Sequence, residues 1–151
     1  MKVLIATDGS DYSKNAVDEA CRSVLRSGES EVLVVSAYEE AYPMAAEPFA
    51  ISAEYYQKLE EAVRDMASNH VNEAKATILG RFPDGSIVVS TEILAGTPAQ
   101  QIVERAKDWD ADLIVVGSHG RGFWGRMLGS VSDGVVHHAP CSVLVVRPRS
   151  M

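Results

Sequence analysis

The residues best suited to chemistry lie in one glycine-rich segment, Gly117–Asp133, with the sequence GSHGRGFWGRMLGSVSD. It holds five of the 11 glycines in the chain, Gly117, Gly120, Gly122, Gly125 and Gly129. Glycine permits positive φ and lets main-chain amides approach a ligand closely. Ser130 is expected to cap a following helix, whose N-terminus, with Arg121 and Arg126 nearby, would attract an anion. The segment therefore predicts a phosphate site, with a loop that only turns tightly as the alternative.

Asp8 and His119 are the titratable side chains placed closest to this predicted site. Asp8 ends an apolar run, so its carboxylate could accept a hydrogen bond from a ribose hydroxyl, hold a metal-bound water, or cap the next turn. His119 could act as an acid, a base or a phosphate ligand. With no visible partner, a surface or backbone-bonded histidine is the favoured interpretation. His137 and His138 are neighbours on a predicted helix, so their side chains diverge and cannot chelate one ion.

Several rival motifs are absent or misplaced. Residues 120–125 match G-x-G-x-x-G, but a dinucleotide fold places that pattern after its first strand and an acidic residue at the end of the next. Here the next predicted strand ends at Arg147. No G-x-x-x-x-G-K-[ST] occurs, which excludes a P-loop NTPase, and no G-x-S-x-G occurs, which argues against a serine hydrolase.

The apolar residues alternate between strand-like runs and helical stripes along the whole chain. Buried strands are predicted at Val3–Ala6, Val32–Ala37, Ile87–Leu94, Leu113–Val116 and Val143–Val146. Helices are predicted from Ser10 or Asp11 to Gly28, from Tyr55 to about Gly80, from a Thr97 cap through Ala106, and over Ser130–His138. This alternation predicts one α/β domain over residues 1–151, a doubly wound parallel sheet with helices on both faces.

The long helix and the strand ends carry two further expectations. One apolar stripe should face the core from the long helix, through Tyr55, Leu59, Val63, Met66, His70, Ala74 and Ile78. Open parallel sheets bind ligands beyond the carboxyl ends of their strands, where strand order reverses. If the first and fourth strands are neighbours, the ligand crevice lies between Asp8 and Gly117.

Composition limits the class of protein. The chain has 151 residues, of which 46% are hydrophobic, enough for a core, and a formal charge of 14 − 21 = −7. That charge argues against a general nucleic-acid or anionic-membrane binder. No apolar stretch is long enough to span a bilayer, so a soluble, cytoplasmic protein is expected. Cys21 and Cys141 are expected to be buried thiols in a reducing compartment.

These residues resemble the universal stress protein family (UspA-like) along the full length of the chain. The resemblance rests on the opening VLIATDGS, on AGTPAQQIVERAKDWDADLIVVGSHG and on GSVSDGVVHHAPCSVLVVRP. The signature of the ATP-binding members is Gly-x2-Gly-x9-Gly-(Ser/Thr). Gly117 and Gly120 match its first half, and Gly129-Ser130 match its end. The stretch between them, Arg121–Leu128, has eight residues instead of nine.

The resemblance implies a fold, a ligand and a dimer. The fold would be adenine-nucleotide alpha-hydrolase-like, with sheet order 3-2-1-4-5. ATP or another adenine nucleotide, with Mg²⁺ or Mn²⁺, would be held at Ala6, Thr7, Asp8, Ala37, Val116, Gly117, Ser118, His119, Gly120, Gly129, Ser130 and Val131. Homodimers would form through the last strand, Cys141–Val146, which would cover an apolar sheet edge.

The predicted function is therefore a nucleotide-dependent, dimeric regulator of a stress response, with no catalytic residue and no metal ligand assigned in the protein. Two alternatives stay open. In one, the shortened loop closes the site, and the chain is a scaffold without nucleotide. In the other, the protein is a weak ATPase or autokinase that uses Asp8 or His119 to orient water or metal.

Overall fold

The computed structural model describes residues 1–40, 52–120 and 127–149. Their elements are β1 (Lys2–Ala6), α1 (Asp11–Glu19), the π-helical turn η1 (Ala20–Val24), β2 (Glu31–Tyr38), α2 (Ala53–Arg81), β3 (Val88–Ala95), α3 (Pro98–Trp109), β4 (Leu113–Gly117), α4 (Ser130–His138) and β5 (Ser142–Val146). Over these ranges, none of the helices combines the length and the apolar character needed to cross a bilayer.

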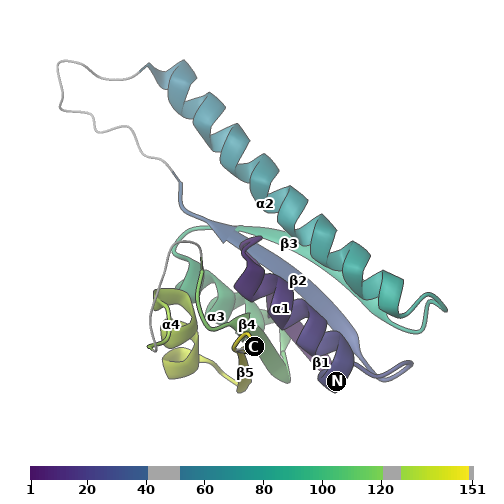
Figure 1. The fold of residues 1–151 in the computed structure, drawn as a ribbon. Coiled ribbons are helices and arrows are strands. Elements are labelled where there is room, and N and C mark those ends of the chain that lie inside the picture. The colour runs from purple at the N-terminus through teal and green to yellow at the C-terminus, as the bar shows by residue number, and fades with distance from the viewer. Residues whose placement is uncertain (41–51, 121–126, 150–151) are drawn as a thin grey trace.

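The strands form one five-stranded parallel sheet in the order β3-β2-β1-β4-β5 (Figure 1). This confirms the predicted α/β fold and the strand order that the family resemblance implied. In the central pair, Val3 of β1 lies opposite Leu113 of β4, and Ile5 lies opposite Val115. The predicted neighbours are therefore adjacent, and strand order reverses beside β1.

The residues of each central strand alternate between two cores, as period-2 strands require. Val3 and Ile5 point into a core closed by α1 and α2, whereas Leu4 and Ala6 point into a second core closed by α3 and α4. Val3, Leu4 and Ile5 are fully buried. Because helices cover both faces of the sheet, the residues of β1 form a continuous apolar run in the sequence. This three-layer arrangement holds the carboxyl ends of β1 and β4 side by side.

The first helical segment ends earlier than predicted. The prediction carried it to Gly28, but α1 passes into the π-helical turn η1, and the helix stops at Leu25, which is extended (φ −73°, ψ 138°). The N–H of Leu25 donates to the carbonyl of Ala20, five residues back. The wider turn and the extended backbone deliver the Leu25 side chain into the core, where it is only 2% exposed.

The predicted core stripe of α2 is wrong in its first half. The buried residues are Ala67, Val71, Ala74 and Ile78, which pack against β2 and β3. Between positions 53 and 66, all of which the structure describes, no residue is buried. Figure 1 shows this half of α2 extending past the end of the sheet. The periodicity correctly predicted a helix, but the first half of α2 does not lie over the sheet, so its apolar side chains are not buried.

The start of α3 matches the prediction in position but not in chemistry. Thr97 is the N-cap residue and Pro98 is the first helical residue. However, the Thr97 side chain makes no capping hydrogen bond within the described residues. Gln100, three residues after Thr97, could complete a capping box, but it donates from Nε2 to Glu104 Oε1 at 2.9 Å. Proline at the first position, rather than a side-chain cap, fixes this helix start.

Candidate functional site

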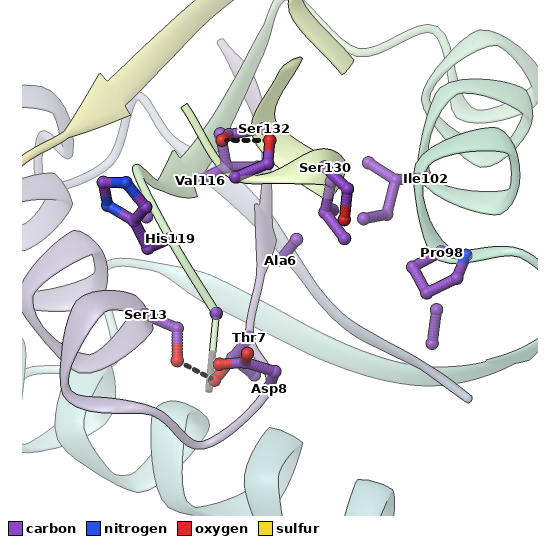
Figure 2. Close-up of a pocket in the computed structure, with 15 residues that line it drawn as sticks. Ala6, Thr7, Asp8, Ser13, Pro98, Ile102, Val116, His119, Ser130 and Ser132 are labelled. Atoms are coloured by element: carbon purple, nitrogen blue, oxygen red, sulfur yellow. Dashed lines mark hydrogen bonds between the residues drawn. The ribbon is translucent and has the colours of Figure 1, made fainter. Parts of the chain in front are cut away.

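A cavity of about 270 Å³ opens at the carboxyl ends of β1 and β4 (Figure 2). It lies at the reversal of strand order, where open α/β sheets place their ligands. Its wall is built by the ends of three strands, by the first turns of α1, α3 and α4, and by the start of the glycine-rich segment. The lining residues are Ala6, Thr7, Asp8, Ser13, Ala37, Pro98, Ile102, Val116, Gly117, His119, Gly120, Gly129, Ser130, Val131 and Ser132.

Eleven of the twelve candidate site residues line this one cavity, although they come from four separate segments of the chain. Ser118 does not line it. Its side chain is 1% exposed, and its Oγ lies 2.9 Å from His119 Nδ1. Its main-chain N–H donates to the Val146 carbonyl at 2.9 Å. Ser118 therefore fixes the neighbouring histidine and strand rather than facing the cavity.

Four lining residues were not among the candidates: Ser13, Pro98, Ile102 and Ser132. Ser13 and Ser132 belong to the first turns of helices whose starts were predicted. Both residues could therefore have been found by including, as candidates, the first turn of each helix that follows a strand end of the site. Pro98 and Ile102 come from α3, which packs on the face of the sheet next to the cavity. A local sequence pattern could not predict that these two residues line the cavity, because their position depends on how the helix crosses the strands.

The cavity is apolar on one side and polar on the other. Figure 2 shows Pro98 and Ile102, from α3, on one side, and Asp8, Ser13 and His119 across from them. Ala6, Ala37 and Val116 add further apolar surface from the strands. A ligand that fits must combine a flat or apolar part with a polar, hydrogen-bonding part.

Side-chain hydrogen bonds around the end of β1 hold the polar side of the cavity in place. Asp8 Oδ1 accepts the N–H of Ser10 at 2.9 Å, so the carboxylate does cap the turn into α1, one of the roles considered for it. The Thr7 hydroxyl lies 3.0 Å from the Ser13 hydroxyl and accepts the N–H of Gly9 at 3.2 Å. Asp8 Oδ2 makes no hydrogen bond within the described residues, which leaves it available to a ligand.

The glycines of this region are required by close approach rather than by positive φ. A Cβ on Gly117 would lie 2.8 Å from the backbone of Tyr12, and one on Gly120 would lie 2.7 Å from Asp8 Oδ2. A Cβ on Gly129 would lie 3.2 Å from His119 Cα. Gly117, Gly120 and Gly129 are not among the glycines with positive φ in the described residues. Gly122, Gly125, Arg121 and Arg126 lie outside the described residues.

The start of α4 differs from the prediction in its cap. Gly129, not Ser130, is the N-cap residue, and it provides no side-chain cap. Ser130 is the first helical residue and lines the cavity. In the part of the chain that the structure describes, the N–H groups of Ser130, Val131 and Ser132 have no hydrogen-bond acceptor. These are the groups with which a helix N-terminus binds an anion.

The segment before α4 is tied back onto the end of β4. The N–H of Gly129 donates to the Ser118 carbonyl at 2.8 Å, and Ser132 Oγ donates to the same carbonyl at 2.8 Å. Ser132 Oγ also lies 3.1 Å from the Gly129 carbonyl. These bonds fix the position of the first turn of α4 relative to Asp8 across the cavity.

His119 is a backbone-bonded histidine, the interpretation favoured from the sequence. Its ring is 7% exposed, with Nδ1 next to Ser118 Oγ and Nε2 hydrogen-bonded to the Met127 carbonyl. The Tyr12 ring packs against it with centroids 5.1 Å apart. Because both ring nitrogens are engaged, this geometry gives His119 a role in holding the segment before α4.

The described residues contain no cluster of three or more histidine, cysteine, aspartate or glutamate side chains that could hold a metal ion. Asp8 is the one carboxylate among the lining residues that the structure describes. A single carboxylate suits a Mg²⁺ or Mn²⁺ ion that arrives on a ligand's phosphates, since Mg²⁺ is commonly held by one or two carboxylates together with phosphate oxygens.

Comparison with known proteins identifies the family. The model of the universal stress protein family matches residues 1–147. The chain belongs to the universal stress protein family. A universal stress protein of Thermus aquaticus is 38% identical over 146 residues, which cover 96% of this chain and 97% of the relative.

Two solved structures resemble this universal stress protein over nearly their whole length. Protein MJ0577 is 26% identical, with a TM-score of 0.75, covering 99% of this chain and 97% of the other. A universal stress protein solved in complex with cAMP is 28% identical, with a TM-score of 0.63, covering 97% of this chain and 96% of the other. The second shows that a relative with this fold binds an adenine nucleotide.

Proposed function

We propose that this universal stress protein binds an adenine nucleotide, ATP foremost, in the cavity and acts as a nucleotide-dependent, cytoplasmic regulator. The observation that carries the proposal is that one cavity combines an apolar side with the first-turn amides of α4, which have no acceptor among the residues that the structure describes. A purine fits the first and a phosphate fits the second. The relative solved with cAMP supports the same class of ligand.

The proposed contacts follow the polarity of the cavity. The base would lie against Ala6, Ala37 and Val116, with Pro98 and Ile102 from α3 opposite. The ribose would lie near Thr7, Gly117 and Asp8, and a ribose hydroxyl would donate a hydrogen bond to Asp8 Oδ2. The phosphates would lie at His119, Gly120, Gly129, Ser130 and Val131. Ser118 is proposed as a positioning residue, because its hydroxyl and amide are both engaged within the protein.

Mg²⁺ or Mn²⁺ would accompany the phosphates and neutralise part of their charge. Asp8 is the described side chain that could reach such an ion directly or through water, and the remaining ligands would come from phosphate and water. The amides of α4 and the hydroxyl of Ser130 would bind the phosphate oxygens themselves.

We propose a regulatory role rather than a catalytic one because the described lining residues offer no general base beside a nucleophile. Both ring nitrogens of His119 are engaged, and Asp8 already caps the turn into α1. A weak hydrolytic activity would have to use Asp8 or His119. Phosphate release that survives both Asp8→Ala and His119→Ala would remove that assignment.

The proposed homodimer forms through β5, which is an edge of the sheet. Val143, Leu144 and Val145 of this strand are only partly buried, and its outer backbone edge is unpaired within the described residues. Pairing with a second β5 would satisfy that edge. The strand begins at Ser142, so Cys141 precedes it.

Isothermal titration tests the ligand. We expect Mg-ATP to bind, and ADP, AMP and cAMP titrated in parallel would rank the phosphate requirement. Gly129→Val should abolish binding, because a side chain at this N-cap position of α4 would clash with the backbone of His119 and displace the first turn of the helix. Gly80→Ala is the matched control, since nothing lies within 4 Å of the added Cβ. No heat with any of these nucleotides at millimolar concentration would refute the proposal.

A further inference from the structure

The exposed half of α2 carries an apolar seam that the nucleotide site does not use. Tyr55, Leu59, Ala62 and Met66 are spaced by four, three and four residues, which is the heptad spacing of coiled-coil core positions. All four are exposed, with Tyr55 at 53%, Leu59 at 39% and Met66 at 46%. Contiguous exposed apolar surface of this kind marks an interaction site.

This seam is distinct from the face that α2 turns toward its own sheet. The inward face is marked by Ala67, Val71, Ala74 and Ile78, and the half-buried Tyr56, Glu60 and Val63 continue it toward the N-terminus. The seam lies on the neighbouring side of the helix. Beyond Met66 the same line meets Asn69 and Glu73, so its apolar character ends where the helix reaches the sheet.

The charges beside the seam indicate what covers it. Lys58 and Asp65 occupy equivalent positions, each one residue before a seam residue. In an antiparallel helix pair these positions face each other, so Lys58 of one copy meets Asp65 of the other, twice by symmetry. In a parallel pair Lys58 would instead meet Val63 of the other copy and Asp65 would meet His70, so Lys58 and Asp65 would not meet. The charge pattern therefore fits a second copy of the same helix, running antiparallel.

The register and the shape of the molecule agree with this pairing. Placing Leu59 opposite Ala62 of the second copy also places Tyr55 opposite Met66. The two central layers of the contact then each combine a large residue, Leu59, with a small one, Ala62. The free half of α2 has about 14 residues and so is about 21 Å long. An antiparallel arrangement sends the two sheets to opposite ends of the pair, whereas a parallel one would bring them together.

We propose that the first half of α2 forms an antiparallel, two-fold contact with α2 of a second copy of this chain. The contact lies on the β2–β3 side of the sheet, whereas β5 forms the opposite edge. Both contacts can therefore form at once, which would join β5-paired dimers into larger assemblies. About three helical turns bury less than a standard interface, so the association is weak and concentration-dependent.

Sedimentation velocity from about 10 µM to about 1 mM tests the contact, because interfaces below standard size associate in this range. We expect the wild type to gain mass with concentration and Leu59→Lys to lose that step. Gln57→Lys is the matched control, with the same charge change on the far side of the same helix, and it should behave as wild type. Far-ultraviolet circular dichroism checks that each variant folds.

Charge exchange gives the sharper test. Lys58→Asp and Asp65→Lys should each weaken association by about three- to tenfold, because each creates two like-charge contacts. An equimolar mixture of the two variants restores both ion pairs across the contact, so association should recover in the mixture alone. A wild-type mass that is constant over the range, or equal behaviour of Leu59→Lys and Gln57→Lys, would overturn the proposal. So would a mixture that associates no better than its components.

Discussion

Gly120→Ala isolates the contribution of Asp8 to the proposed ribose contact without touching Asp8 itself. The added Cβ would lie 2.7 Å from Asp8 Oδ2 and 3.9 Å from its Cγ, and apart from its chain neighbours no other atom of the described residues lies within 4 Å. A contact of 2.7 Å is shorter than real Cβ contacts, so the Asp8 side chain must rotate away. We expect that rotation to weaken the 2.9 Å bond from the Ser10 N–H to Oδ1 at the start of α1.

The structure sets the size of both effects. Hydrogen bonds to charged groups contribute about 1.5–3 kcal/mol, and Asp8 is only partly buried, so we expect a loss of about 1–2 kcal/mol in unfolding free energy. In a chain of this size that lowers Tm by about 2–8 °C. Loss of the carboxylate from a ribose hydroxyl would cost about 1.5–3 kcal/mol of binding, which raises the Kd for ATP by about 10- to 150-fold.

The assay is a double-mutant cycle read by isothermal titration and thermal denaturation. Gly120→Ala, Asp8→Ala and the double variant are compared with wild type, and Gly80→Ala serves as the control for adding a methyl group in open space. If the glycine acts through Asp8, the double variant binds no worse than Asp8→Ala alone. Losses that add in the double variant, or a Kd within twofold of wild type for Gly120→Ala, would refute the reasoning.

The remaining predictions concern stability and thiol reactivity. Ser132→Ala should cost about 1 kcal/mol in urea denaturation, since its carbonyl partners keep other donors or solvent; no loss would mean that the hydroxyl bonds contribute nothing. Gly9→Ala should cost more than Gly85→Ala, because both have φ above +70° but only Gly9 faces the His70 ring, at 2.4 Å. Adding His70→Ala should recover the difference, and equal costs would exclude the steric cause. Cys141 is only partly buried, contrary to the prediction of a buried thiol. This partial burial, reinforced by the charge of Asp112, raises the pKa of its thiol above the ordinary value, so iodoacetamide should label it more slowly in native than in urea-unfolded protein at pH 8. Equal rates would contradict this.

The fold was accessible from the sequence because the apolar residues alternate between strand-like runs and helical stripes along the chain. Val3–Ala6 and Ile114–Val116 are buried on both faces, so they could be recognised without knowing their neighbours. Their adjacency could not be derived in that way, because alternation of strands and helices permits more than one strand order. The order came from the family resemblance, and the register of Val3 with Leu113 confirms it.

The errors arise where tertiary packing overrides a local pattern. Tyr55, Leu59 and Met66 have helical spacing, but spacing alone does not report where the sheet ends beneath the helix. Ser130 follows the sequence rule for a cap, yet Gly129 takes the cap position because the backbone must pass within van der Waals contact of His119. In both places a residue of suitable type was present, and its three-dimensional surroundings decided its role.

The three described glycines of the signature have different structural roles. Gly117 and Gly129 are required by backbone packing inside the protein, against Tyr12 and His119, so a chain could keep both without any ligand. Gly120 alone makes room for a side chain, Asp8, that lines the cavity. Two kinds of group that make no hydrogen bond within the described residues, the first-turn amides of α4 and Oδ2 of Asp8, therefore support a nucleotide more strongly than the glycine spacing does. Phosphate and ribose would satisfy these groups, and this is why the cycle at Gly120 and Asp8 tests the function and not only the fold.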